Sequence, residues 1–315
     1  MSDRIRELDY LKSLFIVLMI IFHLVYIGDS YPYAKQVVYT FHMSAFLIIS
    51  GFLCNVNKEP KSFFRNLLWI LVPYIVMETG YVVMSALLPV RDKVEELSPG
   101  LIVYKAFIAP MGPYWYLHTL MLCNAGYYLI FRITSRWKSF VRIILLGMFL
   151  YLLSELRLVA FDNAIYFLAG TALAQYKIHF IRLFQPNILS LLPLTLLCYF
   201  PQNLHRGTLA GVAITYFVIS LSLAFYTYLP GKVRRISLYI GSNTLVILLF
   251  SPVFTMLSKA YLPLFAFDPS GLCFTVVSVV FVIGGCFGLT YILDKMHLSP
   301  YFLGKQRALP PFPTE

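Results

Sequence analysis

Long apolar runs recur along the whole chain and constrain its fold more than any other feature. Ten segments can be read between proline-containing or charged turns: about 10–28, 37–55, 64–88, 114–132, 140–156, 163–177, 187–202, 210–229, 236–258 and 271–293. Several approach the ~20 residues that a helix needs to cross the hydrocarbon of a bilayer. Backbone groups in hydrocarbon find no outside partner, so spanning segments are helices or strands of a closed barrel. The runs do not alternate polar and apolar residues, which favours helices.

The composition supports a lipid environment. Of the 315 residues, 59% are hydrophobic and only 12% are charged, whereas roughly 25% are charged in a soluble domain. These values exclude a soluble enzyme, a disordered tail and a secreted disulfide scaffold. The five cysteines have no metal-ligand spacing, so no metal site is expected. We predict one all-α, polytopic membrane domain over residues 1–315, with about ten transmembrane helices.

The basic residues predict the orientation of these helices. The net charge of +11 would suggest a nucleic-acid partner in a soluble protein, but in membrane proteins Lys and Arg are retained in cytoplasmic loops. With the N-terminus inside, 18 of the 25 Lys and Arg residues fall on the cytoplasmic side. We therefore expect both termini in the cytoplasm, an inner-membrane location and no nucleic-acid partner. The longest loop, 89–113, would lie outside as a lid or a surface helix.

Polar side chains within the apolar segments are functional candidates, because they are costly in hydrocarbon. At ~1.5 Å per residue, His23 lies in the outer third of the first segment and His42 near the outer start of the second. The other polar or interfacial residues considered are Trp115, His118, Asn163 and Ser251 at similar depth, and Glu78 near the middle of its segment. Histidine suits general base catalysis near neutral pH. Interfacial anchoring and buried structural pairing remain alternatives for these residues.

Two N-terminal stretches carry a family resemblance. Residues 6–23 and 41–53 closely resemble the membrane acyltransferase family 3, particularly sugar O-acetylases acting on surface polysaccharides. Weaker similarities follow in order at 114–117, 167–170 and 241–247. The resemblance implies a ten-helix enzyme that moves an acyl group, usually acetyl, from a cytoplasmic acyl-CoA to a hydroxyl of an extracytoplasmic or lipid-linked glycan. It implies acyl-CoA as a donor substrate and no permanently bound cofactor.

The resemblance also assigns individual residues. The family's essential first-span histidine matches His23, and its arginine eleven positions earlier is Lys12 here. Of its paired arginines only Arg65 is present, and Ser251 stands where a late histidine often occurs. The expected sites are therefore catalytic His23 and His42, donor-binding Lys12 and Arg65, and acceptor-site candidates Trp115, His118, Glu78, Asn163 and Ser251.

Two other functions remain open from the sequence. A transporter or flippase of a glycan or small metabolite would need a substrate path and often uses carboxylates near the midplane. Glu78 is the only clear acidic candidate within a span, and no inverted repeat is visible. An inactive subunit of an envelope complex would explain the departures at Lys12, Leu68 and Ser251. The acyl group, the acceptor and the oligomeric state are not identified.

Overall fold

The protein was analysed as a computed structural model that describes residues 4–87 and 93–312. Within these ranges every regular element is helical. By length and composition, five helices of the described chain could cross a membrane: Pro32–Leu53, Pro60–Leu87, Leu209–Tyr228, Thr244–Phe265 and Leu272–Lys295. The all-α class is confirmed for the described residues. The total of ten spans and the cytoplasmic termini stay predictions.

Most predicted apolar segments correspond to long helices. These are α1 (Arg6–His23), α3 (Pro32–Leu53), α4 (Pro60–Leu87), α6 (Trp115–Ile133), α7 (Ser139–Glu155), α8 (Phe161–Gln175), α11 (Leu209–Tyr228), α12 (Gly231–Ser242), α13 (Thr244–Leu257) and α14 (Leu272–Lys295). The shorter elements are α2 (Val25–Ser30), α5 (Pro99–Phe107), η1 (Gly112–Tyr114), α9 (Phe180–Leu183), η2 (Ile188–Ser190), α10 (Leu191–Tyr199), η3 (Pro201–Asn203), η4 (Ser258–Phe265) and α15 (Ser299–Phe302). The loop 89–113 contains α5, a largely exposed helix, while its residues 89–92 lie outside the described ranges.

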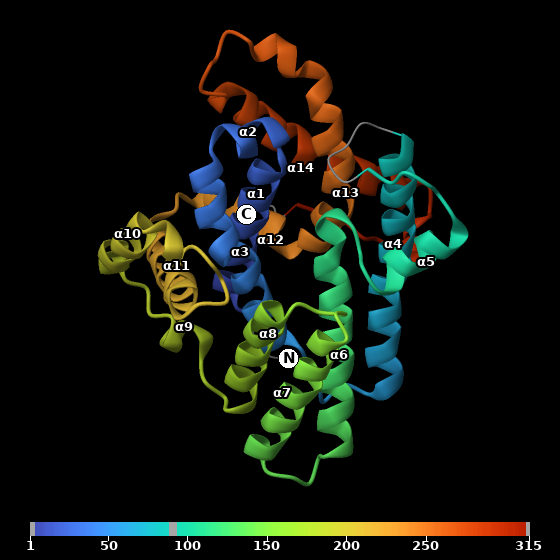
Figure 1. Cartoon of the computed structure of the whole chain (residues 1–315), viewed down its shortest axis with the longest axis vertical. Coiled ribbons are helices and arrows are strands. Elements are labelled where there is room, and N and C mark those ends of the chain that lie inside the picture. Colours follow the sequence, from blue (N-terminus) through green and yellow to red (C-terminus); the bar gives the residue numbers. More distant parts are fainter. Residues whose placement is uncertain (1–3, 88–92, 313–315) are drawn as a thin grey trace.

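Helix α1 lies at the centre of the fold. It contacts α3, α11, α12, α13 and α14, and Figure 1 shows α1 and α3 between the α9–α11 group and the α4–α5 group. Leu11, Phe15 and Ile20 of α1 are fully buried. A helix that is apolar on all sides is typical of such a central position. The polar residues near its two ends are therefore held by a helix whose middle is buried in the core.

Glycines allow α3 and α8 to pack with their backbones in contact. A Cβ at Gly51 would clash with the carbonyl oxygen of Phe167, and a Cβ at Gly170 would clash with that of Ile48. Small residues let membrane helices approach in this way, so that dispersion forces act over a long contact. This packing fixes α3, which carries His42, against α8.

Two predicted spans contain breaks that the apolar pattern did not indicate. Helix α1 ends at His23, because Leu24 is extended with φ −68° and ψ 103°, and α2 begins at the next residue. The ninth segment divides at Asn243 into α12 and α13. The Asn243 side-chain amide donates to the carbonyl oxygen of Tyr239 at 2.8 Å, and such side-chain bonds compete with the helical ladder.

Candidate active site

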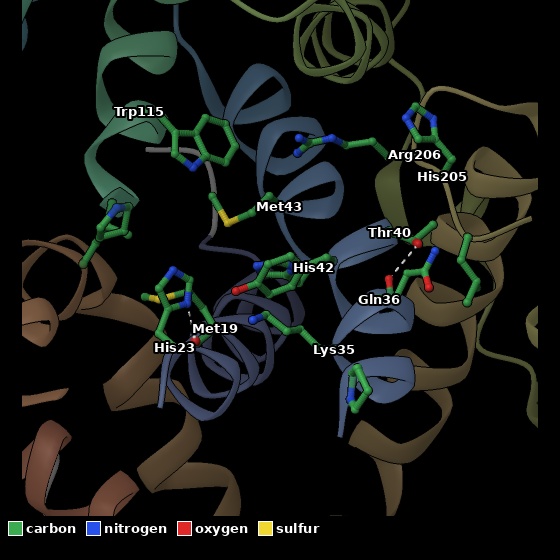
Figure 2. Close-up of a pocket in the computed structure, with 15 residues that line it drawn as sticks. Met19, His23, Lys35, Gln36, Thr40, His42, Met43, Trp115, His205 and Arg206 are labelled. Carbon is green, nitrogen blue, oxygen red and sulfur yellow. Dashed lines mark hydrogen bonds between the residues drawn. The ribbon is translucent and has the colours of Figure 1, made fainter. Parts of the chain in front are cut away.

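A cavity of about 490 Å³ lies where the end of α1 meets α3. Its lining includes His23 from α1, His42 from α3, Trp115 from the start of α6, and Arg206 from the segment before α11. Figure 2 shows these side chains projecting toward a common space. The structure thus brings together His23, His42 and Trp115, which the sequence had placed at similar depth on three different segments.

The break after α1 positions His23. As the last residue of α1, it presents its half-buried imidazole at the cavity wall. Its Nδ1 lies 2.7 Å from the carbonyl oxygen of Met19. A carbonyl only accepts hydrogen bonds, so Nδ1 carries the proton and, in the neutral ring, Nε2 keeps its lone pair. His23 is therefore suited to accept a proton from a ligand in the cavity.

His42 has the same hydrogen-bonding arrangement on α3. Its Nδ1 lies 2.7 Å from the carbonyl oxygen of Val38, so Nδ1 donates and Nε2 is the basic atom. The Tyr39 ring lies near both histidines, with centroid separations of 6.1 Å from His23 and 5.2 Å from His42. The Tyr39 hydroxyl donates to the carbonyl oxygen of Phe22 at 3.3 Å. Tyr39 thereby connects α3 to the end of α1.

Ser251 lies in a second, smaller cavity that His23 also lines. This cavity measures about 120 Å³ and shares Met19, His23 and Pro113 with the larger one. Ser251 is 1% exposed, on α13. The predicted acceptor-site candidate Ser251 is thus beside His23 but outside the cavity that contains His42.

Three predicted candidates line none of the described cavities. Glu78 is fully buried and its Oε1 accepts the backbone N–H of Met111 at 2.6 Å, while its Oε2 has no partner in the described chain. His118 Nε2 bonds the carbonyl oxygen of Phe107 at 2.9 Å. Asn163 is buried at the start of α8. These hydrogen bonds of Glu78 and His118 attach α4 and α6 to the 99–111 segment.

Lys12 lies at another group of cavities, eleven residues before His23. Its Nζ pairs with the Asp9 carboxylate at 2.8 Å, and Asp9 also binds Arg4 Nε at 2.5 Å. Lys12 lines a cavity of about 970 Å³ together with Asn55 and other residues from the ends of α1, α3 and α8. The other predicted donor residue, Arg65, is exposed on α4 and lines none of the described cavities.

The cavities at the two ends of α1 adjoin one another through shared lining residues. Lys12 lines both the 970 Å³ cavity and a smaller one of about 130 Å³. Met43 and Leu248 in turn line both this small cavity and the one that holds His23 and His42. A substrate reaching from Lys12 to His23 would therefore pass Met43 and Leu248.

Sequence reasoning missed three residues of the site. Lys35 and Arg206 were counted only as topology charges, and Tyr39 was not considered. One signal was present: Lys35, Tyr39 and His42 follow the i, i+4, i+7 spacing of one helix face. Arg206 had no such signal, because it reaches the cavity from a distant segment. Within residues 4–87 and 93–312, no three His, Cys, Asp or Glu side chains gather to hold a metal ion.

Comparison with known proteins identifies one family. A family model described as an acyltransferase domain, that of acyltransferase family 3, matches residues 5–291, most of the chain. No curated protein and no solved structure gave a significant match. The matched range includes both histidines, Lys12 and every element that lines the cavities.

Proposed function

Because the chain belongs to the membrane acyltransferase family 3, we propose that it moves an acetyl group from cytoplasmic acetyl-CoA to a hydroxyl of an extracytoplasmic or lipid-linked glycan. The observation that carries this proposal is the series of adjoining cavities from Lys12 to the two histidines. The charge bias of the sequence supports an inner-membrane location with the Lys12 end facing the cytoplasm. Membership of an acyltransferase family favours this function over transport.

The donor would enter at Lys12. The ammonium group of Lys12 can bind a CoA phosphate as a point charge, although it lacks the bidentate geometry of arginine. Along α1, eleven residues separate Lys12 from His23, a rise of roughly 16 Å. That length is on the scale of an extended pantetheine arm. The thioester would then reach the cavity beside His23 while the nucleotide remains at the Lys12 end.

His23 would act as the general base. Its Nε2 accepts the proton of an acceptor hydroxyl as the oxygen attacks the thioester carbonyl carbon. The tetrahedral intermediate collapses with cleavage of the carbon–sulfur bond, and the CoA thiolate takes the proton back from the imidazolium. The products are an O-acetyl ester and free CoA thiol. His42, whose Nε2 is also an acceptor, would orient the sugar by binding a neighbouring hydroxyl.

Acyl transfer by the purified protein in nanodiscs tests this function. With acetyl-CoA and a glycan acceptor, the wild type should form an O-acetyl ester, detected by mass spectrometry, and His23→Ala should form none. The control is His297→Asn, an exposed histidine after α14, which should leave transfer unchanged. Full transfer by a folded His23→Ala protein would refute the general-base role.

Acetyl-CoA binding tests the donor end separately. Lys12→Ala should weaken binding about tenfold or more, since one charged contact contributes ~1.5–3 kcal/mol. Lys12→Arg should restore it. Lys138→Ala, at an exposed lysine before α7, is the matched control. Equal binding by wild type and Lys12→Ala would place the donor elsewhere.

A further inference from the structure

The two cavities that His23 lines carry positively charged side chains and no negatively charged ones among the described residues. Among the described residues, the charged side chains that line them are Lys35, Arg206 and Lys259, with no Asp or Glu. Lys35 and Arg206 line the larger cavity with both histidines, and Figure 2 shows them projecting into the same space from different elements. The site next to the proposed base is therefore a basic pocket.

Arg206 is held in place from two sides. Its guanidinium carbon lies 5.7 Å from the centre of the Trp115 ring, a cation–π contact. Its backbone carbonyl oxygen accepts the hydroxyl of Tyr166 from α8 at 2.6 Å. A cation that is fixed before a ligand arrives loses little conformational entropy on binding it. Arg206 has the planar, multiply donating group that pairs best with carboxylate or phosphate.

Lys35 occupies the opposite part of the cavity, on α3. Its ammonium lies 5.7 Å from the centre of the Tyr39 ring. The side chain passes over the buried Gly28 of α2, where a Cβ would lie 3.1 Å from Nζ. The absence of a side chain at Gly28 therefore leaves room for Lys35 beside the cavity.

No Asp or Glu of the described residues lines this pocket. Asp162 at the start of α8 lies against Gly207, next to Arg206 in the chain, but it does not line the cavity. Cations in a partly desolvated pocket interact strongly with an anion, because the effective dielectric constant is lower than in water. They also disfavour a neutral ligand that would leave them without a counter-ion.

We propose that the acceptor is an anionic glycan, whose carboxylate or phosphate groups bind Arg206 and Lys35 while a neighbouring hydroxyl faces His23. This inference rests on the proposed acyltransferase function and specifies its acceptor. Acidic sugar units and a phosphate that links a sugar to a lipid share the required chemistry. The charged groups would select the acceptor, and the uncharged histidines would act on its hydroxyl.

Matched acceptors that differ only in charge test the inference. The full-length protein in nanodiscs receives acetyl-CoA and either a neutral oligosaccharide of glucose, galactose or mannose, or the same oligosaccharide with C6 carboxylates. A second arm compares a glucosyl lipid with and without a linking phosphate. The KM should be at least about tenfold lower for the anionic member of the preferred pair. The arm that shows this difference identifies the source of the charge.

Variants then attribute the preference to named residues. Arg206→Gln and Lys35→Gln should each raise the KM for the anionic acceptor severalfold more than the KM for its neutral counterpart. Arg157→Gln, at an exposed arginine in the turn between α7 and α8, controls for overall surface charge. An effect of Arg206→Gln on both acceptors alike would show a structural role and overturn the assignment.

The possible failures are distinguishable. Equal KM values for neutral and anionic acceptors, in an enzyme that does transfer acetyl groups, would overturn the anionic acceptor alone. No acetyl transfer to any acceptor in the panel would overturn the acyltransferase function on which the inference rests.

Discussion

The hydroxyl oxygens of Ser50 and Tyr116 lie 2.8 Å apart, and this pair lines the cavity of about 130 Å³ that shares residues with both the Lys12 cavity and the histidine cavity. Most other residues around this cavity are apolar, including Ile16 and Phe46. The pair therefore offers a hydrogen-bonding group in a mainly apolar cavity between the Lys12 end and the histidines. A pantetheine arm carries two amides and would find a partner for one of them here.

Removing the Tyr116 hydroxyl should weaken the donor interaction. A neutral hydrogen bond contributes ~0.5–1.5 kcal/mol, so Tyr116→Phe should raise the KM for acetyl-CoA by roughly two- to tenfold. Steady-state kinetics at saturating acceptor measure this, with the exposed Tyr228→Phe as the control. An unchanged KM would show that the donor does not use this hydroxyl pair.

Filling the space between the Lys12 cavity and the histidine cavity should stop acetyl transfer while Lys12 and the two histidines stay unchanged. Met43 is 6% exposed and lines both the small cavity and the histidine cavity. Met43→Trp adds bulk at this junction, so acetyl transfer should fall by at least about a hundredfold, while acetyl-CoA still binds at Lys12. Met148→Trp, at a methionine that is 64% exposed on α7, is the matched control.

A folded Met43→Trp protein with normal transfer would show that substrates do not pass this point. Overpacking a core can also unfold a protein, so the melting temperature is measured in parallel. Retained acetyl-CoA binding with lost transfer is the result that supports a continuous passage.

The backbone contact between α3 and α8 should make Gly170 sensitive to the smallest substitution. Gly170→Ala places a Cβ against the Ile48 carbonyl oxygen, and the strain should lower stability by ~1–3 kcal/mol. A lower melting temperature in detergent measures this effect. Gly284→Ala on α14, where the space around the glycine is open, should not lower it. Equal melting temperatures for both variants would contradict the close α3–α8 contact.

Glu78 should prove structural. Glu78→Gln keeps an oxygen to accept the Met111 N–H, so acetyl transfer should remain close to the wild-type value. Glu78→Ala leaves that N–H unpaired in a buried position, which costs ~1–3 kcal/mol and should lower the melting temperature. If Glu78→Gln abolished transfer in a protein with an unchanged melting temperature, Glu78 would instead belong to the catalytic machinery.

The sequence predicted the helical class because apolar runs of this length leave few alternatives in lipid. It also predicted that His23 and His42 lie at similar depth, since depth follows from residue counting along neighbouring helices. The structure brings both to one cavity. Counting along a helix does not give its rotation, so the sequence did not indicate that Glu78 and His118 form hydrogen bonds to the 99–111 segment.

Contacts made across large sequence separations were not predictable from one chain. Arg206 meets Trp115 across ninety-one positions, and no local pattern marks that pair. The break at Leu24 was equally hidden, because the sequence around it contains no proline or glycine nearer than Gly28 and is compatible with a helix. Arrangements within one helix, such as the face shared by Lys35, Tyr39 and His42, could have been predicted from the sequence.

The break after His23 has a consequence for how acceptor preference can change. The imidazole belongs to the last residue of α1, whereas Lys35 and Arg206 line the same cavity from α3 and from the segment before α11. A side chain at Gly28 of α2 would meet both Lys35 Nζ and the carbonyl oxygen of Phe22, the residue before His23, so α2 supports the two sides of the cavity together. The proposed base and the proposed selecting cations therefore belong to different segments, so a descendant enzyme could exchange Lys35 or Arg206 for a new acceptor while retaining the same reaction.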